Sequence, residues 1–210
     1  HPNVLFESCS GGGGRFDPGM LYYMPQTWTS DNTDALARLS IQHGTSLCYP
    51  YCTMGAHVSV VPNHQVQRVT PFSMRGNVAM PGQFGYELDV TKLNEEDFSQ
   101  IREQVDFYEK YGSVFHRGDL FRLKNPEDGN ITALEFISED KNTVIVMLYS
   151  MQGLANSPVE YINLQGLEKG AVYKKTQNGE MWSADTLMNV GIPFLTDFDY
   201  KNKVWIFEKQ

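Results

Sequence analysis

The residues best suited to chemistry lie near the N-terminus, in two loops that each follow a short strand-like segment. The first loop covers residues 9–15 (CSGGGGR), and the second covers residues 28–34 (WTSDNTD). In a barrel of alternating strands and helices, the loops that follow the strands build the active site. These two loops are therefore the candidate active-site segments.

Three aspartates could supply a carboxyl group to such a site. Asp31 follows the second strand-like segment, where a substrate and a partner carboxylate could both reach it. Asp34 precedes a helical pattern and suits an N-cap. Asp17 stands before Pro18-Gly19, a context that indicates a turn. The pattern favours Asp31 and leaves Asp17 and Asp34 as open alternatives.

The run of four glycines that begins at Gly11 is either a flexible turn or a loop that approaches a ligand. Glycine permits positive φ and lets the backbone come close to a bound molecule. A phosphate-binding P-loop ends in Gly-Lys-Ser/Thr, whereas this loop ends in Gly14-Arg15-Phe16. It also lacks a G-x-G-x-x-G pattern with a clear following helix. We therefore exclude nucleotide binding.

The three cysteines, Cys9, Cys48 and Cys52, are too few and too odd in number for a disulfide framework. Cys48 and Cys52 lack a second Cys or His pair at ligand spacing, so we expect thiols in or near the core and no metal site. Such thiol usage is typical of a reducing compartment and predicts a cytoplasmic location.

Composition excludes two classes of partner. The chain has 210 residues, is 41% hydrophobic and carries a formal net charge of −8. It contains no Lys/Arg run that would grip a phosphate backbone, so no nucleic-acid partner is expected. Its longest apolar runs, such as 144–149, are too short to cross a bilayer, so no membrane partner is expected.

Periodicity predicts alternating strands and helices up to Gly118. Expected strands are 4–7, 54–61 and 78–86, and 16–19 is expected to form a turn. A helix should run from Thr33-Asp34 to Gln42, with an inner stripe of Leu36, Leu39 and His43 and a C-cap at Gly44. A second helix should begin at Asn94, with an apolar face of Phe98, Ile101, Val105, Tyr108 and Gly112. His57 is interpreted as a satisfied core residue.

After Gly118 the pattern becomes β-rich. The expected strands are 120–123, 131–138, 143–151, 159–164, 172–175 and 204–207, separated by turn residues. This pattern is typical of a small antiparallel sandwich, so we divide the chain into domains 1–118 and 119–210. A complete barrel takes about 250 residues, so the first part supplies only about half of one. Because the chain also begins with His1, we expect it to be the C-terminal piece of a longer protein.

Residues 6–20 and 28–34 closely resemble family 36 α-galactosidases, large enzymes that hydrolyse melibiose and raffinose-type sugars. The resemblance extends from Val4 to the C-terminus and includes residues 54–59. It implies an N-terminal β-sandwich, a central (β/α)₈ barrel and a C-terminal β-sandwich. The implied fold is α/β plus all-β: the C-terminal half of a (β/α)₈ TIM barrel, followed by a small antiparallel β-sandwich domain.

The resemblance also implies a retaining mechanism with two aspartates. The position of the acid/base falls on Asp31, whereas the nucleophile belongs to an upstream Lys-Trp-Asp motif that does not occur in this sequence. Retaining glycoside hydrolysis needs two carboxyl groups about 5–5.5 Å apart, one protonated and one ionised. The chain would thus carry half of an active site, and we expect the fragment alone to be inactive because its nucleophile is missing.

The first loop resembles the galactose-binding loop of the family. Cys9, Ser10, Gly11 and Gly12 would then contact sugar hydroxyls through backbone N–H groups and the Cys9 side chain. A catalytic thiol would need a paired His, which the sequence does not nominate, so Cys9 is either a ligand contact or a core thiol. The aromatic segment 20–28 is either core or a wall against a sugar face, and Arg15 and Trp28 either shape the pocket or are structural.

The resemblance implies no metal and no organic cofactor, and it implies a homo-oligomer, either a dimer or a tetramer. Two other functions remain open. A galactosyltransferase of the raffinose or stachyose synthase type would use the same residues, with a sugar hydroxyl in place of water. A non-catalytic sugar-binding fragment would explain the missing Lys-Trp-Asp motif.

Overall fold

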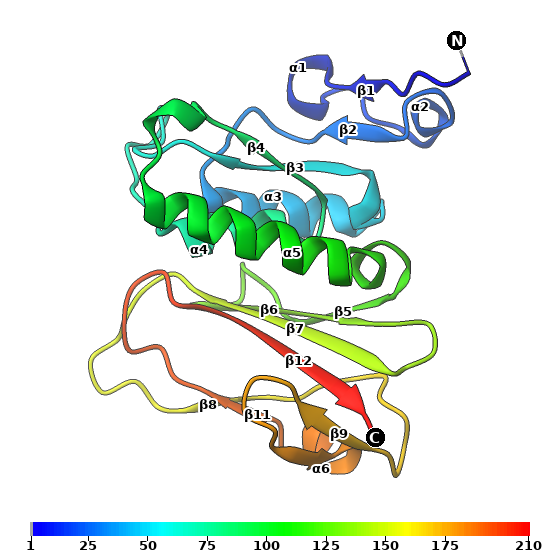
Figure 1. Ribbon diagram of the computed structural model, residues 1–210, viewed down its shortest axis with the longest axis vertical. Helices are drawn as coiled ribbons and strands as arrows, with labels where there is room; N and C mark the ends of the chain where they lie inside the picture. Colours follow the sequence, from blue (N-terminus) through cyan, green and yellow to red (C-terminus); the bar gives the residue numbers. More distant parts are fainter. Residues whose placement is uncertain (1) are drawn as a thin grey trace. The chain divides into compact units, whose positions relative to one another are not determined.

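The computed structural model describes residues 2–210 (Figure 1). Its contacts divide the chain into two compact units, His1–Gly112 and Ser113–Gln210, and each is described by itself. Within the described residues, no helix has both the length and the apolar character needed to span a bilayer.

The first unit is built on a parallel sheet whose four strands stand in chain order. These strands are β1 (Glu7–Ser8), β2 (Gln26–Trp28), β3 (Met54–Ser59) and β4 (Gln83–Glu87). Each neighbouring pair is parallel. Parallel neighbours need crossover connections, and helices supply them. The helices are α1 (Ser10–Gly13), α2 (Pro18–Tyr23), α3 (Ala35–Ser46), α4 (Phe72–Ala79) and α5 (Glu95–Arg117), with short 3₁₀ turns at Tyr51–Thr53 and Val90–Lys92.

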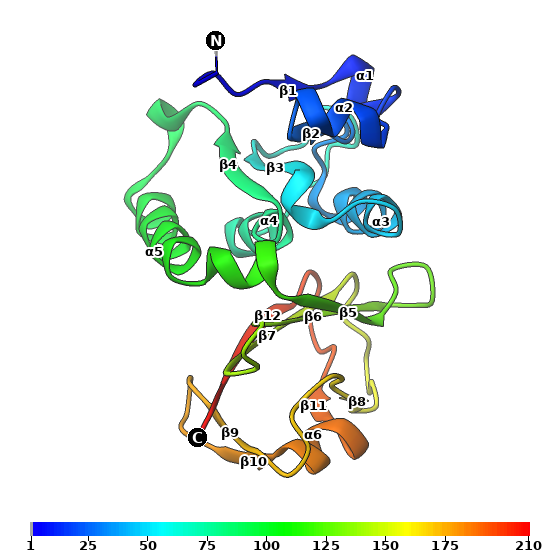
Figure 2. The ribbon, with the colours of Figure 1, turned by 90° about the vertical axis from the view of Figure 1, so that its right-hand side faces the viewer.

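The two faces of this sheet differ in character. Figure 2 shows α3, α4 and α5 along one side of it. On that side Ala56 and Val58 of β3 form an apolar cluster with Phe72 and Ala79 of α4. Because side chains alternate along a strand, the opposite face carries residues such as Glu7, Gln26, Trp28 and His57. The sheet therefore has a helix-covered apolar face and a second face with many polar groups.

Gly55 lies on this polar face, where the side chains crowd together. A Cβ at this position would lie 3.1 Å from Glu7 Oε2, 3.2 Å from Gln26 Nε2 and 3.2 Å from Trp28 Cε3. Gln26 also donates a hydrogen bond from Nε2 to the Glu7 carboxylate. Glycine therefore makes room for side chains that neighbouring strands direct over β3.

The N-terminal predictions need correction. The strand expected at 4–7 is β1 at Glu7–Ser8, and Val4, Leu5 and Phe6 are exposed. The turn expected at 16–19 is the start of α2, because Pro18 suits the first helical turn and Asp17 caps it by accepting the Met20 N–H at 3.1 Å. Tyr22 and Tyr23 are 85% and 71% exposed, so they do not belong to a core of this unit.

Helix α3 follows its predicted start but not its predicted end. The Asp34 carboxylate accepts the Ala37 N–H at 3.0 Å, which confirms the N-cap. Leu39 and His43 are buried as expected, and Leu36 is half-buried. The helix continues to Ser46, so the predicted C-cap at Gly44 is wrong. A single exposed glycine inside a helix is tolerated at a cost of about 1 kcal/mol, which other contacts offset.

Helix α5 begins as predicted. Asn94 Oδ1 accepts the Asp97 N–H at 2.9 Å. Val105, expected on the buried face, is exposed, and Gln104 is buried instead. Gln104 accepts a hydrogen bond from the Tyr86 hydroxyl at 2.9 Å and lies against Gly76, where a Cβ would clash with its amide. A polar side chain therefore occupies the inner face because glycine on α4 leaves it space.

The strand expected at 78–86 is correct only in its second half, because Val78 and Ala79 end helix α4 and β4 begins at Gln83. Short apolar runs do not distinguish a buried strand from a buried helix end. The strand expected at 54–61 is β3, which ends two residues earlier, at Ser59.

The second unit contains two antiparallel sheets. The larger has the order β10-β9-β12-β7-β6-β5, and the smaller pairs β11 with β8. The bounds are β5 (Asp119–Lys124), β6 (Ile131–Ile137), β7 (Thr143–Ser150), β8 (Glu160–Ile162), β9 (Val172–Lys175), β10 (Met181–Ser183), α6 (Ala184–Asn189), β11 (Ile192–Phe194) and β12 (Asn202–Lys209). All six predicted strands occur; β9 has the predicted bounds, and the other five have shifted ends. The elements missed, β10, β11 and α6, are three to six residues long.

The core of the second unit contains one buried carboxyl group. Glu135 stands on β6 between Leu134 and Phe136 and is 0% exposed. Its Oε2 accepts the Gln165 N–H at 2.8 Å, and its Oε1 has no hydrogen-bond partner among the described residues. Burial raises the pKa of Glu135 to about 8, against the smaller opposing effect of that hydrogen bond.

Candidate active site

The glycine loop follows β1 and forms an irregular turn, not a regular helix. Gly11, Gly12 and Gly13 have φ of 69°, 70° and 82°, a region that side chains rarely adopt. The Gly13 N–H closes the turn on the Cys9 carbonyl at 2.6 Å. The positive φ angles that the sequence predicted for this loop are confirmed. The side chain of Ser10, a predicted sugar contact, lies outside the described part of the structure.

The glycine loop packs directly on the loop that carries Asp31. A Cβ at Gly12 would lie 2.9 Å from the Asp31 backbone nitrogen. At Gly13 a Cβ would lie 3.0 Å from the Thr29 carbonyl oxygen. The two segments that the sequence nominated are therefore neighbours, and the absence of side chains at these glycines permits the contact.

Asp31 stands at the carboxyl end of β2 with an exposed side chain. Short hydrogen-bonded turns hold the loop around it. Asn32 N–H donates to Ser30 Oγ at 3.1 Å, and Asp34 N–H donates to Asn32 Oδ1 at 3.0 Å. With the described residues, the Asp31 carboxylate itself makes no hydrogen bond or ion pair. It is thus a fixed but open carboxyl group, suited to proton transfer.

The other two candidate aspartates have structural partners. Asp17 caps helix α2. Asp34 is 3% exposed, caps helix α3 and forms an ion pair with Arg68. A carboxylate that already accepts backbone N–H groups and pairs with a cation is poorly placed to donate a proton to a substrate. The geometry therefore favours Asp31 over both alternatives.

The Arg38 side chain extends from helix α3 to the end of β2, next to the loop that carries Asp31. Its guanidinium carbon lies 4.1 Å from the centroid of the Trp28 ring. Its Nη1 donates a hydrogen bond to Thr29 Oγ1 at 2.6 Å. Arg38 is 4% exposed, and this burial lowers its pKa to about 10, against the opposing attraction of Glu87 and Asp31.

His57 on β3 continues this arrangement. Its ring stacks on Trp28 with centroids 4.8 Å apart and an interplanar angle of 22°. Its Nδ1 lies 3.7 Å from the Glu87 carboxylate at the end of β4 and makes no hydrogen bond among the described residues. His57 is half-buried, so the interpretation as a satisfied core residue is wrong. Trp28 is 9% exposed and structural in these contacts.

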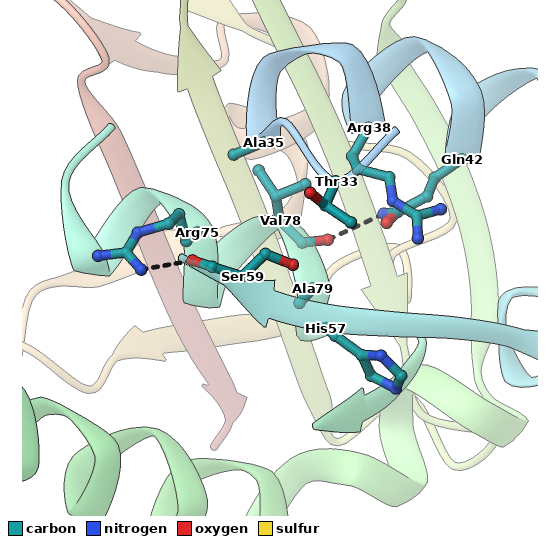
Figure 3. A pocket seen from close by; sticks show the side chains of 9 residues that line it. All are labelled: Thr33, Ala35, Arg38, Gln42, His57, Ser59, Arg75, Val78 and Ala79. Atoms are coloured by element: carbon teal, nitrogen blue, oxygen red, sulfur yellow. Dashed lines mark hydrogen bonds between the residues drawn. The ribbon is translucent and has the colours of Figure 1, made fainter. Parts of the chain in front are cut away.

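A small cavity lies beside Arg38, between helices α3 and α4 and the end of β3. Figure 3 shows Arg38, Gln42 and Thr33 on one side of β3 and His57 on the other. Gln42 donates to the Val78 carbonyl at 2.9 Å, but Arg38 Nη2 has no partner among the described residues. Sequence reasoning missed Arg38. The available signal was a cation four residues after the N-cap Asp34, inside the buried stripe of the helix.

The cysteines match their predicted environment only in part. All three are free, Cys9 and Cys48 are exposed, and Cys52 is half-buried. The core interpretation therefore fails for Cys9 and Cys48. The exposed thiol of Cys9 follows β1 directly, beside the glycine loop. Within the part of the chain that the structure covers, no group of three or more His, Cys, Asp or Glu side chains could hold a metal ion. Arg15 is exposed.

Comparison with known families gives two matches. Residues 1–118 match the Melibiase family. Residues 131–207 match the glycosyl hydrolase family 36 C-terminal domain.

Individual relatives agree with these matches. Alpha-galactosidase AgaA of Geobacillus stearothermophilus is 50% identical over 206 residues, which are 97% of this chain and 28% of AgaA. Alpha-galactosidase Mel36A of Lactobacillus acidophilus is 44% identical over 99% of this chain and 28% of its own length. The chain thus spans less than a third of the length of these curated relatives.

Solved structures are also similar. A variant of AgaA from Geobacillus stearothermophilus in complex with raffinose has a TM-score of 0.96 and 48% identity, covering 100% of this chain and 29% of that one. The galactosidase domain of the α-galactosidase-sucrose kinase AgaSK has a TM-score of 0.97 and 46% identity, with the same coverage. A further AgaA variant was solved in complex with stachyose.

Proposed function

Since this chain belongs to the Melibiase family, we propose that it forms the acid/base half of the active site of a retaining α-galactosidase. The observation that carries the proposal is the open carboxylate of Asp31, which lies against the glycine loop at the carboxyl ends of parallel strands. Raffinose and stachyose, bound in structures of similar enzymes, indicate the substrate class: terminal α-galactosyl residues of oligosaccharides of the melibiose and raffinose type.

In this mechanism Asp31 acts twice. An upstream aspartate attacks the anomeric carbon while the Asp31 carboxyl gives its proton to the departing glycosidic oxygen. Asp31, now ionised, then takes a proton from a water molecule whose oxygen attacks the anomeric carbon. The bond between the sugar and the nucleophile breaks, and Asp31 is again protonated. Its exposed position and its freedom from competing hydrogen bonds suit both transfers. The nucleophile must come from the part of the protein that this chain does not contain.

The glycine loop is proposed to hold the galactosyl group. Backbone N–H groups at Gly11 and Gly12, together with the exposed Cys9 thiol, would bind sugar hydroxyls, and Ser10 is included on the resemblance alone. No metal or organic cofactor takes part in this scheme, since proton transfer and nucleophilic attack need only carboxyl groups.

The proposal also covers architecture and assembly. We assign residues 1–118 to the C-terminal half of a (β/α)₈ barrel and residues 119–210 to a β-sandwich. Four sequential parallel strands and two antiparallel sheets support this assignment. We further propose a homo-oligomer, either a dimer or a tetramer, in the cytoplasm. Three free cysteines are consistent with a reducing compartment.

Product analysis of the full-length protein tests the function. We expect raffinose to be cleaved to galactose and sucrose, with α-galactose as the first anomer detected by NMR. Transfer of galactose to a sugar acceptor at low sugar concentration, exceeding release to water, would favour the galactosyltransferase alternative. Binding of galactose without any turnover of raffinose or an aryl α-galactoside would favour the non-catalytic alternative.

A matched pair of glycine variants tests the contact between the two loops. Gly11 and Gly12 share a positive φ, but only at Gly12 would a new Cβ meet the Asp31 backbone, at 2.9 Å, whereas at Gly11 nothing lies within 4 Å. We expect Gly12→Ala to lower kcat/KM at least about tenfold more than Gly11→Ala, because small misplacements of a catalytic group are costly. Steady-state assays of both variants, with thermal unfolding as a stability check, make the comparison. Equal losses in the two variants would contradict a role for this contact.

A further inference from the structure

We propose that Arg38 is a positioning residue for the acid/base carboxylate, and that it does so by fixing the Thr29–Asp31 segment. This inference rests on the proposed function, because it assigns Arg38 a task in the chemistry of Asp31. Arg38 itself is buried, so it acts through Asp31 and not by touching the substrate.

The first argument is mechanical. Arg38 Nη1 donates a 2.6 Å hydrogen bond to Thr29 Oγ1, two residues before Asp31. Its guanidinium plane is held by the Trp28 ring at 4.1 Å. Gly12 and Gly13 press on the same segment from the glycine loop. The Asp31 loop is therefore clamped between the glycine loop and the Arg38 side chain.

The second argument concerns rigidity. Trp28 stacks on His57, and His57 Nδ1 faces the Glu87 carboxylate at 3.7 Å. The series Glu87, His57, Trp28 and Arg38 thus connects the ends of β4, β3 and β2 with the first turns of α3. Arginine stacked on an aromatic ring loses little further freedom when it forms a hydrogen bond. Such support is what a catalytic group needs if it is to stay in one geometry.

The test uses the full-length protein with Arg38→Met and Arg38→Lys, and with Arg75→Met as the matched control. Arg75 is a second partly buried arginine stacked on an aromatic ring, with its guanidinium carbon 4.6 Å from the Phe72 centroid and a hydrogen bond to the Ser59 carbonyl. We expect Arg38→Met to lower kcat on raffinose by about tenfold with KM little changed, and to affect an activated aryl α-galactoside less, because only the acid is misplaced. Arg38→Lys should lower kcat less than Arg38→Met, because lysine keeps a donor for Thr29 and loses only the planar fork that stacks on Trp28.

An unchanged kcat in Arg38→Met, or an equal loss of kcat in Arg75→Met, would overturn the proposal. If Arg38→Met does not fold, Thr29→Val decides the mechanical part. It should lower kcat by about tenfold for substrates with poor leaving groups, with KM little changed, because only the acid is misplaced. No loss in Thr29→Val would overturn it. These failures are distinguishable from failure of the proposed function, in which the wild type itself would hydrolyse no α-galactoside.

Discussion

Asp31→Ala in the full-length protein is expected to lower kcat on raffinose by about 10²–10⁴-fold, the usual contribution of a positioned general acid and base. The sugar leaving group of raffinose is poor and needs the proton. An activated aryl α-galactoside needs little protonation, so its first step should be spared and the covalent intermediate should accumulate. A burst of the released phenol, followed by slow turnover, is the expected kinetic signature.

Azide makes this prediction specific. Azide attacks the intermediate without a general base, so it should restore turnover of the aryl substrate and yield α-galactosyl azide, identified by NMR. Asp17→Ala is the matched control, because it removes a helix cap at the neighbouring helix α2 and should cost about 1 kcal/mol of stability with no azide effect. Unchanged activity in Asp31→Ala, or a loss that azide does not rescue, would transfer the acid/base role to another group.

The candidate site was predictable wherever a residue type answers a local requirement. Positive φ at Gly11 and Gly12 could be expected because only glycine adopts it without strain. The cap role of Asp34 followed from its place before a helical pattern. Arg38 was missed, because its role depends on contacts with Trp28 and Thr29 at the end of β2, and the burial of its side chain was its one signal in the helical pattern.

The same distinction holds for the fold. Helix α5 and six of the eight strands of the second unit were predicted correctly, whereas the short strands β10 and β11 were missed. Helix α4 was missed because its apolar residues lie around Gly76 without a clear helical stripe, and Val78 resembled the start of a strand. The inner position of Gln104 depends on that missed helix. The predictions therefore failed where the burial of a residue on one element depends on the side chains of another element.

Glu135 provides the second prediction with a large effect, in stability and not in catalysis. Its pKa in the folded protein is about 8, raised by burial from an ordinary value of 4.5. The folded state thus favours the protonated form. The resulting stability is fully present below pH 4.5 and is lost as the pH rises toward 8. One pKa unit corresponds to about 1.4 kcal/mol, so the loss over this range is on the order of a few kcal/mol.

Glu135→Gln should remove this dependence. Glutamine has nearly the same shape, stays neutral at every pH and keeps an oxygen that can accept the Gln165 N–H. Near pH 4.5 the variant and the wild type should unfold at similar temperatures, whereas near pH 8 the variant should unfold at a clearly higher temperature. Differential scanning calorimetry at several pH values measures both.

Glu168→Gln is the control in the same unit, because it gives a pH dependence of opposite sign. Glu168 is exposed and pairs with Lys209, and hydrogen bonding to that lysine lowers its pKa. Its stability contribution is therefore present at neutral pH and is lost as the pH falls, and it should be small because exposed pairs are screened by water. If Glu135→Gln kept the pH dependence of the wild type, the buried carboxyl group could not be its source. That result would mean that Glu135 ionises in the folded protein as easily as in the unfolded chain. Such easy ionisation is not expected, because a single backbone N–H does not offset the cost of desolvating a buried carboxylate.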